Sequence, residues 1–475
     1  MHIVFLNPQG NFDPADSYLT EHPDFGGQLV YVKELAQAMA QQGHKVDIVT
    51  RRIRDPSWPE FCADQDSYSM CKENLRILRF PFGGDLFLTK EKLWPHVPEL
   101  VDGILQFYRG VLPDFITAHY ADGGYAAALM FKKTGIQFSF TGHSLGAQKL
   151  DKLGTTTDNW LSMENRFKFS NRLAAERISI KYAAKIMVST KQEMNEQYAH
   201  PLYISLLDQF DKTKFEIIPP GVNENIFSQT PALTDKMLKQ KLDALFGINE
   251  GPVILVSSRL DEKKNIIGVV QAYSEDNALI EKAHLVLCFR GINDPEADIH
   301  KLSKEEQRVL RKILNLIERG HIQKHIHFLN IGSQLELAAT YRYFAQRGSV
   351  FALTSLYEPF GLAPLEAAAT GLAPVVTKNG GPSEIFFDGS GVLVDPTSPK
   401  SISEGLMDGL KRYSELSKMA IQRVKEKYTW HQTADRYLHS INDVMHSKQK
   451  IDRVEQMKLN DKDLINDYLK SIADR

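Results

Sequence analysis

The sequence predicts an α/β protein with two doubly wound parallel sheets in separate domains. Short apolar runs bounded by Gly, Pro or Asn alternate with longer segments of helical period, which is the pattern of parallel strands joined by helices. These runs form two successive series along the chain. The length of 475 residues agrees with two domains, because one hydrophobic core rarely grows beyond about 250–300 residues.

The first series of apolar runs predicts strands at residues 3–6, 46–50, 75–80, 115–119, 138–142, 185–189 and 215–219. The second series predicts strands at residues 253–258, 285–290, 326–330, 350–355, 374–377 and 392–395. We place the domain boundary near residue 228, so that residues 1–228 and 229–430 form the two domains. The charged tail beyond about residue 447 is predicted to be either a docking helix or a frayed end.

The composition favours a small-molecule ligand over nucleic acid or a membrane. Lys and Arg total 57 against 59 for Asp and Glu, and the formal net charge is −2. The N-terminus leads directly into a strand, and no apolar run reaches the roughly 20 residues of a membrane-spanning helix. Three cysteines, Cys62, Cys71 and Cys288, match no metal-ligand spacing and cannot pair completely. These features predict an unprocessed protein of the reducing cytoplasm.

The segment "PDFGGQLVYVKELAQAMA" predicts a helix that begins at Gly26 and Gly27. A helix N-terminus offers unpaired N–H groups, and glycine lets a phosphate approach the backbone. The alternative is that the two glycines only relieve a tight turn, since the dinucleotide signature G-x-G-x-x-G is absent.

The segment "SSRLDEKKN" (257–265) directly follows the first predicted strand of the second domain. Arg259 and Lys264 together suit a diphosphate, because a guanidinium binds phosphate oxygens with two parallel hydrogen bonds and an ammonium adds a compact charge. The alternative interpretation is a solvated, charged turn.

Two glutamates stand eight positions apart in "EPFGLAPLE". Glu358 falls in a predicted loop and could face a sugar or the reacting centre, whereas Glu366 falls on the first turns of a helix and could accept two ribose hydroxyls. A glycosidase acid and base would also be a carboxylate pair, but it needs a set separation that the sequence does not reveal. Glu366 could also simply favour its helix N-terminus electrostatically.

Polar and basic residues follow two further strands of the first domain. His143 and Ser144 come directly after the strand at 138–142, with Lys149 about two turns later. Arg166 and Arg172 fall in one predicted helical stretch, and "HYADGG" again places glycines after a strand. A lone histidine is more often structural than catalytic, but ligands of open α/β sheets bind beyond the carboxyl ends of the strands. The site is therefore expected in a cleft between the domains.

Taken together and in this order, these motifs resemble those of the GT-B-fold retaining glycosyltransferases, and the sucrose-phosphate synthase family most closely. The resemblance covers about residues 1–445. It implies two Rossmann-like domains that face each other across a cleft, an N-terminal one for the acceptor and a C-terminal one for the nucleotide sugar. It also implies that residues 431–475 pack back on the N-terminal domain. The phosphatase-like extension of some relatives is either missing or cut away, and the product phosphate is expected to be removed by a separate sucrose-phosphate phosphatase.

The resemblance also implies roles for individual residues. Arg259 and Lys264 would bind the diphosphate, and Glu366 the ribose. Glu358 and the segment Phe360, Gly361 and Leu362 would hold the donor glucose. Gly27 and Gln28 would line the junction of donor and acceptor, with His143 near the transferring sugar. Arg259, Lys264, His143 and Glu358 are the residues expected to act in catalysis. The residues expected to bind the acceptor are Gln28, Lys90, Tyr120, Ser144, Lys149, Arg166 and Arg172.

The implied reaction transfers glucose from UDP-glucose to the 2-hydroxyl of fructose 6-phosphate, with retention at the anomeric carbon. No protein nucleophile, metal or cofactor is implied, and no nucleic acid or membrane partner is expected. Two alternatives remain at this point. One is a related transferase, such as a sucrose synthase that uses free fructose or a mannosylfructose-phosphate synthase that uses GDP-mannose. The other is a non-catalytic nucleotide-sugar sensor.

Overall fold

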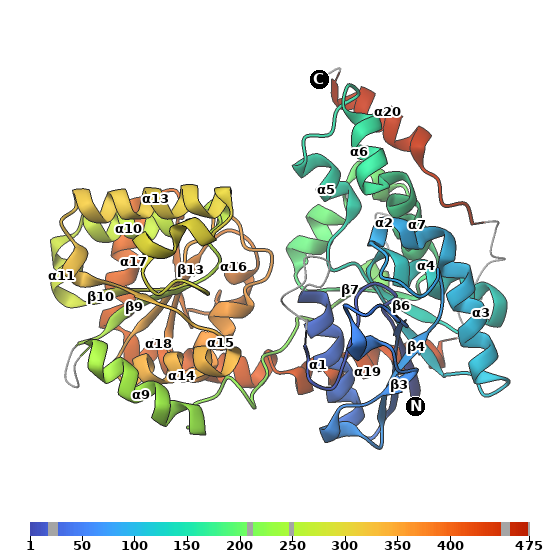
Figure 1. Cartoon of the computed structure of the whole chain (residues 1–475), viewed down its shortest axis with the longest axis horizontal. Helices are drawn as coiled ribbons and strands as arrows, with labels where there is room; N and C mark the ends of the chain where they lie inside the picture. The colour runs from blue at the N-terminus through green and yellow to red at the C-terminus, as the bar shows by residue number, and fades with distance from the viewer. Residues whose placement is uncertain (18–26, 207–211, 247–250, 448–456, 474–475) are drawn as a thin grey trace. The chain divides into compact units, whose positions relative to one another are not determined.

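The computed structural model describes residues 1–17, 27–206, 212–246, 251–447 and 457–473 (Figure 1). The chain divides into two compact units. Unit 1 comprises Met1–Pro219 and Thr433–Arg475, and unit 2 comprises Pro220–Gln432. The first division thus falls after Pro219. The sequence analysis placed this boundary slightly later in the chain, near residue 228. The expected cleft between the domains stays a prediction.

Unit 1 contains an eight-stranded sheet of order β3-β4-β2-β1-β5-β6-β7-β8. All neighbouring strands are parallel except β3 and β4, which are antiparallel. The strands are β1 His2–Leu6, β2 Lys45–Arg51, β3 Gln65–Asp66, β4 Leu75–Phe80, β5 Phe115–His119, β6 Phe138–Thr141, β7 Lys185–Val188 and β8 Phe215–Ile217. The strand order reverses direction between β1 and β5, which makes the carboxyl ends of these strands a topological switch point.

Unit 1 contains α1 Gly27–Gln41, α2 Lys90–Leu93, α3 Val97–Tyr108, α4 Tyr120–Thr134, α5 Gly146–Lys152, α6 Trp160–Phe167, α7 Phe169–Tyr182, α8 Pro201–Ile204 and α20 Lys462–Ala473. The division between the units falls within α19, Trp430–His446. In α1 the apolar residues Leu29, Val32, Leu35 and Met39 recur at helical spacing and are buried. The helical stretch expected to carry both Arg166 and Arg172 is two helices, because Lys168 adopts a left-handed conformation (φ 50°) between them.

Unit 2 contains a six-stranded, wholly parallel sheet of order β11-β10-β9-β12-β13-β14. Its strands are β9 Val253–Ser257, β10 His284–Cys288, β11 Ile326–Leu329, β12 Val350–Leu353, β13 Ala373–Thr377 and β14 Val392–Val394. Its helices are α9 Leu233–Phe246, α10 Ile266–Ser274, α11 Asn277–Lys282, α12 Pro295–Asp298, α13 Lys304–Arg319, α14 Gln334–Ala345, α15 Leu362–Thr370, α16 Gly381–Ile385, α17 Pro399–Lys411 and α18 Tyr413–Lys427. Here the order reverses between β9 and β12.

Helices cover both faces of the unit 2 sheet (Figure 1). Alternate residues of β9 belong to two separate core clusters, Ile254 and Val256 to one and Val253 and Leu255 to the other. A strand buried on both faces must be apolar throughout, which is why these strands read as continuous hydrophobic runs. The predicted α/β class with two parallel sheets is therefore confirmed, and each predicted strand is present. The two-residue strand β3 was not predicted, because Gln65 and Asp66 form no apolar run.

The described part of the C-terminal tail is a docked helix. On α20, Ile465 and Leu469 are completely or almost completely buried in the core of unit 1. The Tyr468 hydroxyl donates a hydrogen bond of 2.9 Å to Asp151 on α5, and Arg177 lies 3.1 Å from Asp461 just before the helix. Residues 448–456 of the tail lie outside the described residues. Among the helices that the structure describes, none has the length and apolar character needed to cross a membrane.

Replacing Leu469 with alanine tests this docking. The variant should lower the free energy of unfolding of unit 1 by about 2–5 kcal/mol, the usual loss for a fully buried leucine. Ile472→Ala is the matched control, since Ile472 lies on the same helix and is 38% exposed. Scanning calorimetry of the full chain measures both variants. A frayed end predicts that neither variant changes the unfolding transition.

Candidate functional site

The switch point of unit 2 carries an ion pair between two of the predicted residues. Lys264 ends the short 3₁₀ helix Glu262–Lys264 after β9, and Glu358 lies in the loop after the neighbouring strand β12. The Lys264 Nζ atom lies 2.6 Å from Oε2 of Glu358, and the two side chains are 24% and 13% exposed. The structure thus brings the expected diphosphate lysine and the expected sugar carboxylate into direct contact.

Asn265 holds the two loops of this ion pair together. Its backbone is left-handed (φ 52°), which asparagine tolerates better than most residues. Its side-chain amide donates to the carbonyl of Thr354 after β12 at 3.1 Å and to that of Pro396 at 2.7 Å. Lys263 adds a backbone bond, because its carbonyl accepts from the N–H of Leu356 at 2.9 Å. Lys264 is therefore positioned by a polar network that spans both loops.

Two glycines that the sequence analysis did not single out hold the backbone of Glu358. The Gly381 N–H donates to the Glu358 carbonyl at 2.9 Å. A Cβ atom on Gly380 would lie 2.0 Å from that carbonyl oxygen, and one on Gly381 would lie 2.3 Å from the Phe360 carbonyl oxygen. No other residue fits there. The sequence signal was present, since a glycine pair follows the strand at 374–377.

Glu366 lies on α15 and is separate from the ion pair. The helix begins at Leu362, which is 38% exposed, after Gly361 in a left-handed conformation (φ 107°). Among the residues that the structure describes, no hydrogen-bond partner is seen for the Glu366 carboxylate, whose burial raises its pKa to about 8. Burial thus outweighs any stabilisation by the helix N-terminus, and hydroxyl donors from a ligand would favour the charged form.

Arg259 has a different environment from Lys264. It lies in the loop after β9, is exposed, and forms no ion pair with a described residue. It lines an open pocket together with Ser303 and Arg308 at the start of α13. The guanidinium is therefore available to an anion, whereas the Lys264 ammonium already has a carboxylate partner.

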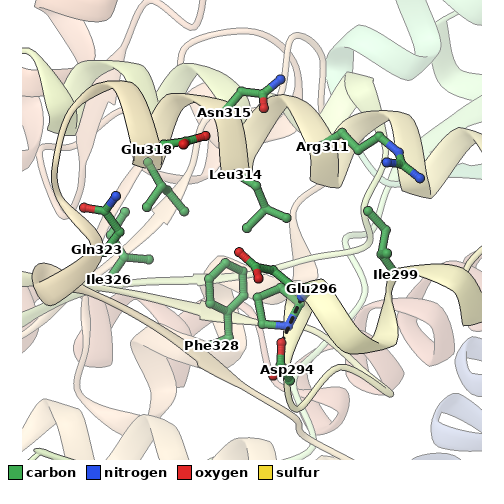
Figure 2. A pocket seen from close by; sticks show the side chains of 12 residues that line it. Asp294, Glu296, Ile299, Arg311, Leu314, Asn315, Glu318, Gln323, Ile326 and Phe328 are labelled. Atoms are coloured by element: carbon green, nitrogen blue, oxygen red, sulfur yellow. Dashed lines mark hydrogen bonds between the residues drawn. The ribbon is translucent and has the colours of Figure 1, made fainter.

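A second pocket of unit 2 contains none of the predicted site residues (Figure 2). Phe328 and Ile326 of the edge strand β11 line it together with Leu314 of α13, and Glu296 and Arg311 also belong to the lining. The pocket belongs to the β11 edge of the sheet, two strands away from β9. The predicted chemistry therefore lies elsewhere in this unit.

In unit 1, two predicted residues follow neighbouring strands in strained conformations. Tyr120 follows β5 and His143 follows β6 shortly after its end, with φ values of 65° and 57°. Left-handed backbone is uncommon outside glycine and is often retained at functional sites. Both residues lie at the carboxyl ends of strands beside the β1/β5 switch point.

The His143 ring is held by a buried polar network. Its Nε2 atom lies 3.0 Å from Nδ1 of His119, and Nε2 of His119 lies 3.2 Å from the hydroxyl oxygen of Thr117. Burial lowers the pKa of His143 to about 3, and burial followed by repulsion from His143 holds the pKa of His119 well below its usual range. Both rings are thus neutral near pH 7. The sequence analysis missed His119 and Thr117, although "ITAH" places them on one face of a strand.

The first turns of α1 contribute to the same region. Tyr31 packs its ring edge-on against His143 at a centroid distance of 5.0 Å, and its hydroxyl lies 3.0 Å from that of Tyr437. Gln28 is three positions earlier, on the same helix face as Tyr31. Gly27 is the first residue of the helix, and Gly26 lies outside the described residues.

Arg172 contacts two other predicted acceptor residues, Ser144 and Tyr120. It is only 5% exposed and pairs with Glu176 at 2.9 Å. It also donates to the Ser144 carbonyl at 2.8 Å and to the Ser144 hydroxyl at 3.1 Å. Its guanidinium lies 4.7 Å from the centroid of the Tyr120 ring. Arg172 therefore fixes the loop after β6 as well as adding charge.

The four predicted basic residues influence one another. Lys149 and Arg166 both lie over the ring of Phe167, at 4.4 and 4.9 Å from its centroid. Burial comes first among the effects that lower the pKa of Lys149 to about 8, and the positive charges of Arg172, Lys90 and Arg166 follow. Glu91 opposes this shift. A dianion would relieve the repulsion within this cationic group.

Comparison with known proteins gives the family. Residues 1–246 match the family model "Sucrose synthase first GT-B domain", and residues 239–427 match "Glycosyl transferases group 1". A probable sucrose-phosphate synthase from Thermosipho melanesiensis is 46% identical over 93% of this chain and 96% of its own length. The chain belongs to the sucrose-phosphate synthase family. It is therefore a GT-B glycosyltransferase of sucrose synthesis, as the motifs predicted.

More distant relatives agree with this family. Sucrose-phosphate synthase 1 from Arabidopsis thaliana is 30% identical over 96% of this chain, and the chain spans only 48% of that protein's length. A solved structure of a sucrose-phosphate synthase from Thermosynechococcus elongatus superposes with a TM-score of 0.66 at 22% identity, over 94% of this chain and 99% of that chain. At that identity the match supports the GT-B fold.

The raised pKa of Glu366 in this synthase-family protein predicts a pH-dependent stability. A carboxyl whose folded pKa lies above its unfolded value weakens folding progressively as the pH rises between those values. Glu366→Gln should therefore gain stability relative to the native chain from pH 5 to pH 8, and the difference should level off above pH 8. Calorimetry across this range measures it, with Glu281→Gln on the exposed surface of unit 2 as the control. A difference that is constant with pH would contradict the assigned pKa shift.

Proposed function

We propose that this sucrose-phosphate synthase family protein transfers glucose from UDP-glucose to fructose 6-phosphate, with retention, giving sucrose 6-phosphate and UDP. The observation that carries the proposal is the cationic group of unit 1, formed by Lys90, Lys149, Arg166 and Arg172. Burial and then repulsion from Arg172, Lys90 and Arg166 lower the pKa of Lys149, and a neutral acceptor would do nothing to offset this repulsion. A phosphate on the acceptor would satisfy these charges.

On the donor side, Arg259 and Lys264 bind the diphosphate in this proposal, and Glu366 accepts the ribose hydroxyls. Glu358 and the segment Phe360 to Leu362 hold the glucose. The chemical task is to stabilise negative charge on the departing UDP, which preorganised cations do well. The diphosphate competes with Glu358 for the Lys264 ammonium, which lies 2.6 Å from that carboxylate in the free protein.

On the acceptor side, Lys149 and its basic neighbours bind the phosphate, while Gln28, Tyr120 and Ser144 hold the fructose. The departing phosphate oxygen takes the acceptor proton, so the proposal needs no protein nucleophile, metal or cofactor. A separate phosphatase would remove the product phosphate. We place the protein in the cytoplasm, in keeping with its three free cysteines.

Sucrose synthase activity is the second candidate. It is favoured by the family model for residues 1–246, which is named for that enzyme. It would use free fructose as the acceptor. Transfer of mannose from GDP-mannose would instead support a mannosylfructose-phosphate synthase. Binding of UDP-glucose without turnover would support a non-catalytic nucleotide-sugar sensor.

Loss of a leaving-group cation gives the first test. Lys264→Ala, like Arg259→Ala, should lower kcat about 10²–10³-fold, the scale for removing one preorganised charge-stabilising donor. Lys263→Ala is the matched control, because Lys263 is the exposed neighbour in the same 3₁₀ helix. Steady-state UDP release measures all three. Near-normal kcat with weaker UDP-glucose binding alone would remove Lys264 from leaving-group stabilisation.

The acceptor phosphate gives the second test. Charge-assisted hydrogen bonds contribute about 1.5–3 kcal/mol each, so fructose 6-phosphate should be preferred over fructose by orders of magnitude. Lys149→Ala should reduce this preference mainly by raising KM for fructose 6-phosphate. In the native protein KM should also rise above pH 8, because the Lys149 ammonium, with a pKa of about 8, loses its proton there.

Lys152→Ala provides the control for Lys149, since Lys152 lies on the same helix and is exposed. UDP release and the sugar product are followed with each acceptor supplied separately. Comparable turnover on free fructose would refute the synthase proposal and favour sucrose synthase. An equal loss on both acceptors in Lys149→Ala would mean that Lys149 shapes the site without binding the phosphate.

A further inference from the structure

We propose that Thr117 and His119 are positioning residues that keep the proton of the neutral His143 ring on Nδ1, so that His143 offers its ligand a hydrogen-bond donor. The three side chains form a continuous chain, with 3.2 Å from Thr117 Oγ1 to His119 Nε2 and 3.0 Å from His119 Nδ1 to His143 Nε2. That the ligand oxygen belongs to the donor sugar rests on the proposed function.

The fold holds this chain of side chains rigidly. Thr117 and His119 are two positions apart on β5, so their side chains lie on the same face of the strand, and both are 0% exposed. The ring of Phe5 on the adjacent strand β1 stacks on His119 at 5.4 Å with an angle of 6° between the planes. A different rotamer of His119, with other hydrogen-bond partners, would therefore disturb the core of unit 1.

Two proton arrangements fit the observed distances. In the first, the Thr117 hydroxyl donates to His119 Nε2, and the His119 Nδ1–H donates to His143 Nε2. The proton of His143 then lies on Nδ1. In the second, every bond runs the other way: His143 Nε2–H donates to His119 Nδ1, and His119 Nε2–H donates to the Thr117 oxygen.

The buried hydroxyl of Thr117 decides between them. Within the described part of the chain, the Thr117 oxygen has no partner other than His119. In the second arrangement its hydrogen would have no acceptor, and a buried donor without a partner is destabilising. In the first arrangement the Thr117 hydroxyl and the His119 N–H both donate, and the donor left over is the Nδ1–H of His143, whose side chain is only partly buried. The free histidine side chain prefers its proton on Nε2, so the protein reverses that preference.

This arrangement limits what His143 can do. Its Nε2 lone pair is occupied by His119, and its Nδ1 atom, which has no partner among the described residues, carries a hydrogen. Such a ring can donate to a hydroxyl or phosphate oxygen, but it has no free lone pair with which to take a proton. His143 would therefore bind an oxygen of the transferring sugar and would not act as a general base.

Nitrogen NMR of the full chain labelled with ¹⁵N-histidine tests the assignment without any substrate. The ring shifts separate a protonated nitrogen from one with a lone pair, and the loss of a signal pair in His143→Gln identifies His143. We expect a protonated Nδ1 near pH 7 in the native protein and in Thr117→Ser. A protonated Nε2 in the native protein would overturn the proposal, whatever the variants show.

Two substitutions of His119 extend the test. In His119→Asp, a carboxylate oxygen takes the place of Nδ1 and can only accept, so the proton of His143 should move to Nε2. In His119→Asn, the amide can still donate, and the Nδ1 proton should remain. An Nδ1 proton that persists in a folded His119→Asp protein would show that His119 does not control it.

Activity completes the design. His119→Asp should lower kcat about tenfold relative to His119→Asn, the effect of losing one neutral hydrogen bond in the transition state. Equal kcat in the two variants would contradict a donor role for His143. A native protein that does not turn over UDP-glucose would refute the proposed function, while the NMR result would still decide where the proton lies.

Discussion

The chemistry of both units depends on one constraint, the reversal of strand order in a parallel sheet. Parallel strands all end at the same edge, and the loops that follow them separate where the order reverses. In unit 1 this occurs between β1 and β5, and in unit 2 between β9 and β12. Lys264 and Glu358 follow the two strands of the second reversal, and Tyr120 follows a strand of the first. These side chains lie in loops beyond the strand ends, where polar groups are tolerated more easily than in the largely apolar sheet interiors.

The charged side chains of the two candidate sites are neutralised to different degrees. In unit 2 the Lys264 ammonium and the Glu358 carboxylate neutralise each other, so that a ligand must exchange one partner for another. In unit 1 Arg172 is neutralised by Glu176, but its charge still lowers the pKa of Lys149. The pair in unit 2 thus favours a polar ligand that competes with a carboxylate. The cationic group in unit 1 favours a ligand that brings negative charge of its own.

Sequence periodicity predicted the fold well, because a continuous apolar run indicates a strand that is buried on both faces of its sheet. It did not predict β3, because Gln65 and Asp66 are polar residues of an edge strand that pairs only with β4. It also missed the break at Lys168, since a single left-handed residue leaves the helical pattern almost unchanged. The motifs identified Lys264 and Glu358 as separate residues. That they form an ion pair depends on the order of strands in space, which no local pattern contains.

The same limit explains why His143 was predicted without the residues that hold it. His119 and Thr117 looked like ordinary positions of a buried strand, and only the pairing of β5 with β6 brings them to His143. A buried strand normally excludes polar side chains, so Thr117 and His119 on β5 must find hydrogen-bond partners in each other and in the His143 ring beside them. That mutual satisfaction leaves one ring nitrogen for a ligand. A neutral donor at this position suits a reaction in which the departing phosphate, and no protein side chain, receives the acceptor's proton.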